Sequence, residues 1–191
     1  MPNRPIRRRC FLKALGGTVL GSAVAVPQAV HAAAQRSAIM PVERDLRLVN
    51  LHTGDAIDTS FWTPQGYQQD ALQSINHVLR DHRADQATNM DIRLLEALTE
   101  LSHRLGTSEP FHVISAYRSP QTNEKLRQQG RKVAKRSYHM KGQAIDIRVP
   151  GVDLKDLHRA ALSLKRGGVG FYGGPGFVHV DVGPVRRWGR G

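Results

Sequence analysis

Two short fragments of this sequence carry side chains of the kind that bind metal ions. In residues 137–146, His139 precedes Asp146 by seven positions, and residues 177–181 contain His179 and a further carboxylate, Asp181. Two imidazoles and one carboxylate around an ion leave a fourth position for water, which is the pattern of a catalytic zinc site. From the spacing alone, a metal site and a pair of structural histidines remain equal alternatives.

Both fragments alternate in the manner of a strand with one buried face. In residues 144–149 two isoleucines and a valine alternate with Asp146 and its neighbours. In residues 177–182 three valines occupy one face, which places His179 and Asp181 on the other. His139 comes just before the first strand, and Gly142 allows the chain to turn between them. If the two strands are neighbours, both imidazoles and the carboxylate of Asp146 converge.

The rest of the chain provides the elements that must position these fragments. Apolar residues at helical spacing predict helices over about residues 67–82, 90–105 and 153–165, the last ended by Gly167 and Gly168. Ser119 followed by Pro120 predicts another helix start. Alternation predicts a hairpin within residues 45–62 and strands over 111–115 and 169–172. Residues 128–136 are expected to be a loop. The C-terminal segment from residue 184 is expected to cover a sheet edge. The expected fold class is α+β, a small antiparallel sheet packed with helices.

The first 32 residues have the composition of an export signal. Arg8-Arg9-x-Phe11-Leu12-Lys13 precedes an apolar run rich in glycine and alanine, and a small-residue cleavage pattern follows at residues 30–32. The arginine pair resembles the twin-arginine type. The apolar run is too short for a membrane span, so we expect a periplasmic or cell-envelope protein without a stable span after signal removal. An uncleaved N-terminal anchor is the alternative. Residues 33–44 are expected to form a leader, 45–188 the main domain and 189–191 a tail.

Composition and charge narrow the function classes. A chain of 191 residues with 40% hydrophobic and 23% charged residues fits one globular domain plus an appendage. The signal holds five basic and no acidic residues, so its removal lowers the formal net charge from +12 to +7. The only cysteine, Cys10, leaves with it, which restricts metal ligands to His, Asp and Glu. The remaining charge is modest and scattered, so we expect an acidic envelope polymer, and not nucleic acid, as partner.

Sequence motifs of other catalytic sites are missing from this chain. It has no His-Glu-x-x-His segment, no Gly-x-Ser-x-Gly elbow, no glycine-rich phosphate loop and no Cys-x-x-Cys pair. Four further histidines fall in the expected helices and are interpreted as structural: His77, His82, His103 and His158. His112 lies opposite Val113 on the strand over 111–115 and is a weaker candidate for the site.

Several motifs occur in an order that is typical of one peptidase family. They are Tyr117-Arg118-Ser119-Pro120, Ser137-x-His139-Met-x-Gly142-x-Ala144-x-Asp146, Gly168-Val-Gly-x-Tyr172 and Phe177-Val-His179-Val-Asp181. The pattern resembles the zinc peptidases of the D-alanyl-D-alanine carboxypeptidase group, the M15 family, and more narrowly its murein-endopeptidase branch. Residues 50–54, residues 79–83 and Arg187-Trp188 extend the resemblance over nearly all of residues 45–188.

The resemblance implies a function as well as a fold. It implies one zinc ion per chain, bound by His139, Asp146 and His179, in a fold shared with the hedgehog signalling domain. It also implies a murein endopeptidase that hydrolyses peptide cross-links of peptidoglycan during cell-wall remodelling. We expect a monomer. A non-catalytic murein-binding protein with a zinc ion and a D,D-carboxypeptidase are the alternatives.

Four further residues are candidates for roles around the zinc. Arg118 is suited to hold a substrate carboxylate or a developing oxyanion, and its alternative role is a surface residue at a helix start. Ser137 could orient a ligand or only cap a turn, and Tyr172 could assist the transition state. Both are also predicted, together with Arg118, to bind substrate. The general base is less clear, because relatives usually place an acid just before the last histidine and residues 171–178 contain none. Asp181 could activate the water or hold the second nitrogen of an imidazole, and both remain open.

The bond that is cut is not determined by the residues. A D-alanine to diaminopimelate cross-link, a direct cross-link between two diaminopimelate residues and a terminal D-alanine remain alternatives.

Overall fold

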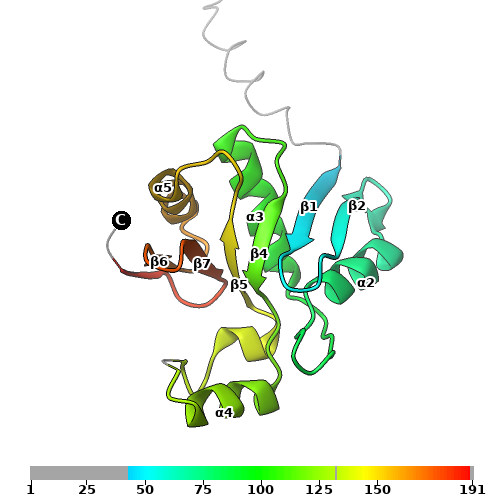
Figure 1. Ribbon diagram of the computed structural model, residues 1–191. Coiled ribbons are helices and arrows are strands. Elements are labelled where there is room, and N and C mark those ends of the chain that lie inside the picture. Colours follow the sequence, from blue (N-terminus) through cyan, green and yellow to red (C-terminus); the bar gives the residue numbers. More distant parts are fainter. Residues whose placement is uncertain (1–42, 132, 190–191) are drawn as a thin grey trace, which may run out of the picture. The chain divides into compact units, whose positions relative to one another are not determined.

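The computed structural model describes residues 43–131 and 133–189 (Figure 1). The predicted export signal and residues 33–42 of the predicted leader lie outside the described residues. Within the part of the chain that is described, no helix has both the length and the apolar character needed to cross a bilayer.

One eight-stranded sheet organises the domain, in the order β3-β2-β1-β4-β5-β7-β6-β8. The strands are β1 (Arg44–Asn50), β2 (Ala56–Thr63), β3 (Gly66–Tyr67), β4 (Phe111–Ser115), β5 (Ala144–Arg148), β6 (Gly168–Tyr172), β7 (Phe177–Asp181) and β8 (Arg186–Trp188). Most pairs are antiparallel, but β1 with β4 and β6 with β8 are parallel. The α+β class is confirmed, while the sheet is larger than expected and mixed. The C-terminal segment from residue 184 does reach a sheet edge, where β8 pairs with β6.

Four α-helices and one 3-10 turn complete the described domain. They are α2 (Gln69–Val78), α3 (Ile92–Leu105), α4 (Pro120–Gln128), α5 (Leu154–Leu164) and the 3-10 turn η1 (Tyr138–Lys141). The side chain of Ser119 caps α4 and Pro120 begins it, as predicted. α2 is shorter than predicted, because a turn closed by the bridge between Asp81 and Gln86 follows it.

The end of α5 differs from the prediction. Lys165 itself adopts the left-handed conformation, with φ of 53°, and ends the helix before the two glycines. Gly168 is instead the first residue of β6, where a side chain would not fit: an added Cβ would lie 2.6 Å from Oδ2 of Asp181. This glycine therefore serves the packing of the sheet and not the end of the helix.

The hydrophobic core lies between one face of the sheet and the helices α2, α3 and α5. Four leucines of α3 are fully buried, and they pack in one cluster with Ile145 and Ile147 of β5 and Val178 of β7. The apolar face of the two strands that carry the candidate ligands is thus turned towards the helices. α4 and the η1 turn lie together at one end of β4 and β5, away from α5 (Figure 1).

Candidate metal centre

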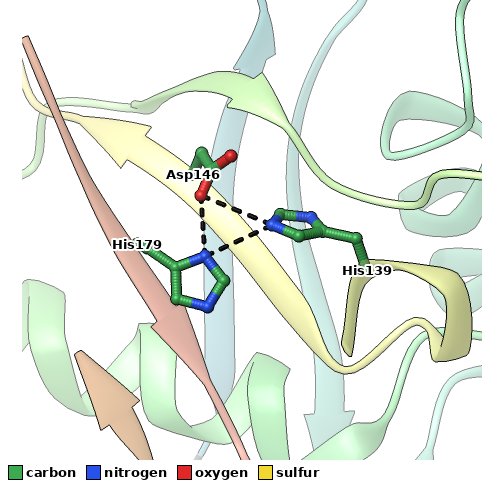
Figure 2. A group of neighbouring side chains, drawn as sticks. All are labelled: His139, Asp146 and His179. Carbon is green, nitrogen blue, oxygen red and sulfur yellow. Dashed lines mark hydrogen bonds and ion pairs between the residues drawn. The ribbon is translucent and has the colours of Figure 1, made fainter. Parts of the chain in front are cut away.

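The three residues predicted to bind a metal come together from two strands and a turn. β5 and β7 are antiparallel neighbours, and their register places Asp146 directly opposite His179. His139 lies in η1, which ends at Gly142 in the left-handed conformation, with φ of 64°, and leads into β5. One ligand atom from each residue lies within 4.8 Å of the others, and no other such group occurs among residues 43–131 and 133–189. Figure 2 shows the three side chains pointing towards one another.

The facing atoms are closely spaced. Nδ1 of His179 lies 2.8 Å from Oδ1 of Asp146, and Nε2 of His139 lies 3.2 Å from Nδ1 of His179 (Figure 2). Nε2 of His139 is 3.4 Å from Oδ1 of Asp146. His139 is 4% exposed and His179 is 8% exposed, so solvent does little to screen these three atoms from one another.

Each imidazole has an inner nitrogen, which faces the other two candidate ligands, and an outer nitrogen, which faces away from them. Each outer nitrogen has a hydrogen-bond acceptor. Nδ1 of His139 lies 2.7 Å from the carbonyl oxygen of Ala116, and Nε2 of His179 lies 3.0 Å from Oδ2 of Asp181. Because a carbonyl and a carboxylate oxygen only accept, these outer nitrogens carry the protons. In neutral imidazoles the inner nitrogens therefore present lone pairs to the carboxylate of Asp146 and to each other.

This arrangement fits a bound cation. Two lone pairs and a carboxylate oxygen that face one another at these distances repel unless a positive charge lies between them. Two nitrogens and one oxygen are a donor set that zinc accepts, and an acceptor on the second nitrogen of each imidazole is the usual arrangement around metal-bound histidines. The chemistry of the donor set, and not only its spacing, therefore suits zinc.

In the metal-free protein, where an inner imidazole nitrogen can carry a proton, electrostatics hold the carboxylates of the site ionised. Burial raises the pKa of Asp146, but the imidazoles of His139 and His179 outweigh it and hold that pKa far below its usual range. Burial lowers the pKa of His179, but hydrogen bonds to Asp146 and Asp181 outweigh it and the net shift is upward. For Asp181, burial is again outweighed, here by His179 and Arg186, and its pKa falls to about 2.

Asp181 uses both of its oxygens inside the fold. Oδ1 accepts hydrogen bonds from the backbone N–H of Gly168 at 3.1 Å and of Gly183 at 2.9 Å. Arg186 donates to both oxygens, at 3.0 Å to Oδ1 and 2.6 Å to Oδ2, and Oδ2 also faces His179. The residue is 1% exposed. Its carboxylate is therefore surrounded by protein donors, one of which is the second nitrogen of His179.

A cavity of about 260 Å³ opens over the three candidate ligands. Its lining includes Arg118, Ser137 and Tyr172, the residues predicted to bind substrate. His112 does not line it and does not belong to the candidate metal-binding group.

Arg118 presents a guanidinium that has few partners within the described residues. It is 9% exposed, Nη2 donates to Oγ of Ser137 at 2.9 Å, and Nε has no hydrogen-bond partner there. Burial lowers the pKa of Arg118, with Asp146 acting in the opposite direction, but a guanidinium keeps its charge in proteins. Ser137 caps η1 by accepting the backbone N–H of His139. The serine therefore contacts both the arginine and the turn that carries a candidate ligand.

Tyr172 forms part of an aromatic wall of the cavity. Its ring stacks on Phe177 with 4.6 Å between centroids, and its hydroxyl accepts a hydrogen bond from Nε1 of Trp188 at 2.9 Å. The ring of Trp188 in turn lies 5.1 Å from that of His179.

Arg186 and Trp188 are cavity residues to which the sequence reasoning assigned no role. The available signal was the pair of glycines at alternate positions of β6. An added Cβ at Gly170 would lie 2.4 Å from the ring of Trp188, so this glycine leaves the space that the indole fills. Alternating glycines in a strand indicate that another part of the chain approaches closely.

Comparison with known proteins identifies the family. The family model described as peptidoglycan L,D-endopeptidase MepK matches residues 38–188. The chain is 45% identical over 177 residues to the peptidoglycan L,D-endopeptidase MepK of Escherichia coli K12, which covers 93% of this chain and 94% of the relative. It is 39% identical over 175 residues to the probable peptidoglycan L,D-endopeptidase MepK of Haemophilus influenzae, with 91% of each chain covered. No solved structure matches. The resemblance noted in the sequence is confirmed, and the chain belongs to the M15 peptidase family, in the branch described by the MepK model.

Proposed function

We propose that this protein is a zinc-dependent endopeptidase that hydrolyses L,D bonds in peptidoglycan cross-links. The observation that carries the proposal is the group formed by His139, Asp146 and His179, in which both outer nitrogens have acceptors and both inner nitrogens face the carboxylate. Membership of a peptidase family whose named relatives act on peptidoglycan supports the same assignment.

Each site residue has a role that its contacts support. His139, Asp146 and His179 would hold one zinc ion, which supplies a bound water of lowered pKa and polarises the scissile carbonyl. Arg118 binds a substrate carboxylate or the developing oxyanion, because its buried guanidinium has no carboxylate partner within the described residues. Ser137 holds that guanidinium, and Tyr172 contributes to the wall against which substrate lies.

We assign Asp181 to positioning His179 and not to accepting a proton from water. Its oxygens are occupied by two backbone N–H groups, Arg186 and His179, and its side chain is enclosed by protein. A general base must reach the proton that it removes, directly or through one water. Asp181 does not line the cavity, whereas the three candidate ligands do.

The names of the relatives point to one of the three bonds that the sequence left open. An L,D-endopeptidase cuts between the carbonyl of an L centre and the nitrogen of a D centre. Of the two cross-links among the alternatives, only the direct cross-link between two diaminopimelate residues has this stereochemistry, since the D-alanine to diaminopimelate cross-link joins two D centres, and removal of a terminal D-alanine would be a carboxypeptidase reaction. We propose this cross-link as the substrate.

We further propose that the protein acts in the periplasm. Residues 1–32 have the features of a twin-arginine export signal, residues 33–44 of a leader and residues 45–188 of the peptidase domain. Peptidoglycan lies outside the inner membrane, so export is consistent with the proposed substrate. Replacing Arg8 and Arg9 together by lysine should retain the protein in the cytoplasm, as measured by cell fractionation.

Digestion of purified sacculi tests the proposed function. We expect the protein to convert dimers with direct diaminopimelate cross-links into monomers, detected by mass spectrometry of the released muropeptides. EDTA should stop the reaction without unfolding the chain, added zinc should restore it, and His139→Ala should be inactive. Full activity of a metal-free His139→Ala protein would overturn the proposal. Binding to sacculi without any release would favour the murein-binding alternative, and release of D-alanine alone would favour a carboxypeptidase.

A further inference from the structure

We propose that Arg186, in the C-terminal strand β8, is a positioning residue that sets the orientation of His179 as a metal ligand. It acts through Asp181. The inference rests on the metal centre of the proposed function, and it adds the C-terminal strand to that centre.

The contacts form a continuous chain from the strand to the candidate ligand. Arg186 donates two hydrogen bonds to the carboxylate of Asp181, one to each oxygen, at 3.0 and 2.6 Å. Oδ2 of the same carboxylate lies 3.0 Å from Nε2 of His179, whose other nitrogen faces Asp146 at 2.8 Å. A guanidinium that binds a carboxylate with two parallel hydrogen bonds fixes its plane as well as its position. Arg186 therefore determines where the acceptor for His179 lies.

The plane of the carboxylate matters because the acceptor decides which nitrogen carries the proton. While Oδ2 accepts from Nε2, the proton stays on that outer nitrogen and Nδ1 keeps its lone pair for the metal. Without Arg186, the two backbone donors of Gly168 and Gly183 hold only Oδ1. Oδ2 would then have a single partner, and the side chain of Asp181, which is 0% exposed, would keep a negative charge without its cation.

The surroundings of Arg186 are shaped to hold it in this place. Its guanidinium carbon lies 5.0 Å from the ring centroid of Tyr138 and 5.1 Å from that of Trp188, both within the range of cation–π attraction. β8 pairs in parallel with β6, which brings Arg186 beside Gly168. An added Cβ on Gly168 would lie 2.4 Å from Nη1 of Arg186, so only glycine leaves room for the ion pair.

Arg187 provides a matched control on the same strand. It is an exposed arginine next to Arg186, and it makes no side-chain hydrogen bond or ion pair within the described part of the chain. Its replacement removes the same charge from β8 without changing the contacts of Asp181.

Zinc affinity of the Arg186→Gln, Arg186→Lys and Arg187→Gln variants tests the inference. We expect Arg186→Gln to bind zinc about 3 to 10 times more weakly than the wild type, which is less than the loss expected when the direct partner of a metal ligand is removed, because Asp181 remains in place. Arg186→Lys, which can keep a single charged contact, should fall between the two, and Arg187→Gln should stay within about twofold of the wild type. Competition with a chromogenic chelator measures all four affinities.

A second readout reports on His179 itself. In the zinc-loaded protein, the Nε2–H proton of His179 should exchange with solvent faster in Arg186→Gln than in the wild type, as followed by NMR. A purely structural role of the arginine would lower thermal stability without this local change. Circular dichroism confirms that each variant is folded. If Arg186→Gln does not fold, the comparison of Arg186→Lys with Arg187→Gln still tests the inference.

Two results would overturn the inference. One is an unchanged zinc affinity and unchanged exchange in folded Arg186→Gln. The other is an equal loss of affinity in Arg187→Gln, which would show a general effect of charge on β8. Failure of the proposed function looks different, because the wild type would then bind no zinc or would bind zinc and release no muropeptide.

Discussion

The two imidazoles of the candidate metal centre are held by different kinds of partner. His139 donates from Nδ1 to the backbone carbonyl of Ala116, just after β4, whereas His179 faces the side chain of Asp181, which Arg186 holds in turn. A backbone carbonyl is placed by the path of the chain and stays present whatever side chain occupies position 116. A carboxylate held by an arginine depends on two side chains and their charges.

The same contrast extends to the segments around each histidine. The backbone N–H of Arg118 donates to the carbonyl of His139, and that of Asp91 donates to the carbonyl of Gly142, so the η1 turn is tied to its neighbours by main-chain bonds. On the other side, β8 is a three-residue edge strand whose contribution comes from Arg186 and Trp188. One half of the centre is thus set by the fold, and the other half by side chains that sequence changes can tune.

We expect the largest effect from replacing Asp146, the residue that faces both histidines. Asp146→Asn replaces the carboxylate that faces both inner nitrogens with a neutral amide, which is a poor zinc ligand. We expect loss of bound zinc and of peptidoglycan hydrolysis down to the level of the metal-free protein. Zinc per chain, measured by atomic absorption, and muropeptide release are the readouts. His112→Ala, outside the group, should retain both, and a full complement of zinc in Asp146→Asn would disprove the ligand assignment.

The next effect distinguishes the two halves directly. Asp181→Asn removes the charged acceptor of His179, and we expect zinc affinity to fall about 10- to 100-fold. Ala116→Gly leaves the carbonyl that accepts from His139 in place, so we expect a change of less than about threefold. Competition with a chelator measures both variants under the same conditions. Equal losses in the two variants would remove the contrast between a backbone-held and a side-chain-held imidazole.

A glycine on the His139 side gives a smaller effect, on stability. Gly142 has φ of 64°, and an added Cβ would lie 2.8 Å from the carbonyl oxygen of Asn89. We expect Gly142→Ala to lower the free energy of unfolding by about 1–3 kcal/mol, since both the backbone conformation and the close contact oppose a side chain. Urea denaturation of the metal-free protein measures this.

Gly174→Ala is the matched control for that change. No heavy atom lies within 4 Å of an added Cβ at Gly174, so the free energy of unfolding should change by less than about 0.5 kcal/mol. Equal stabilities of the two variants would show that the turn after His139 tolerates a side chain, and that the fold does not constrain this half as tightly as its contacts indicate.

The sequence predicted the elements that show a local pattern, and it did not predict the contacts between distant segments. The strand alternation around Asp146 and His179 is a local property, and so are the helical spacing of α3 and the Ser119-Pro120 helix start, and all of these elements were predicted. The pairing of β8 with β6 is not local. Three residues are too few to show a periodicity, and Arg186 reaches Asp181 only because the chain crosses to the far side of β6 after β7.

The prediction that Gly167 and Gly168 end the helix before them is wrong for the same reason. Gly168 follows a helix and so was expected to end it, but the reason for a glycine there is the ion pair between Asp181 and Arg186, which lies 13 to 18 positions later in the chain. The parallel pairing of β1 with β4 was missed for an equivalent reason, because two strands and two helices separate them along the chain. Local patterns reveal which face of an element is buried, but not which distant segment lies against it.

Asp91 offers the smallest effect and tests the backbone-held half through pH. Its carboxylate begins α3 and accepts hydrogen bonds from Arg93 and from Gln143, the residue after Gly142. Arg93, with a smaller contribution from Gln143 against the effect of burial, lowers the pKa of Asp91 from 3.8 to about 2. A carboxyl whose pKa is lower in the folded chain stabilises it above the unfolded pKa, and that stabilisation is lost as pH falls from about 4 to about 2.

Asp91→Asn should therefore lower the free energy of unfolding by about 1 kcal/mol at pH 7, a value reduced from the full shift because the partner Arg93 is largely exposed. The difference from the wild type should shrink towards zero at pH 2, because asparagine still caps a helix and only the charge is missing. Urea denaturation of the metal-free proteins at pH 7, 4 and 2 measures it, with Asp70→Asn, an exposed carboxylate in the first turn of α2, as control. A difference that stays constant with pH would mean that Asp91 acts through its shape alone, and that the turn carrying His139 depends on main-chain bonds without help from charge.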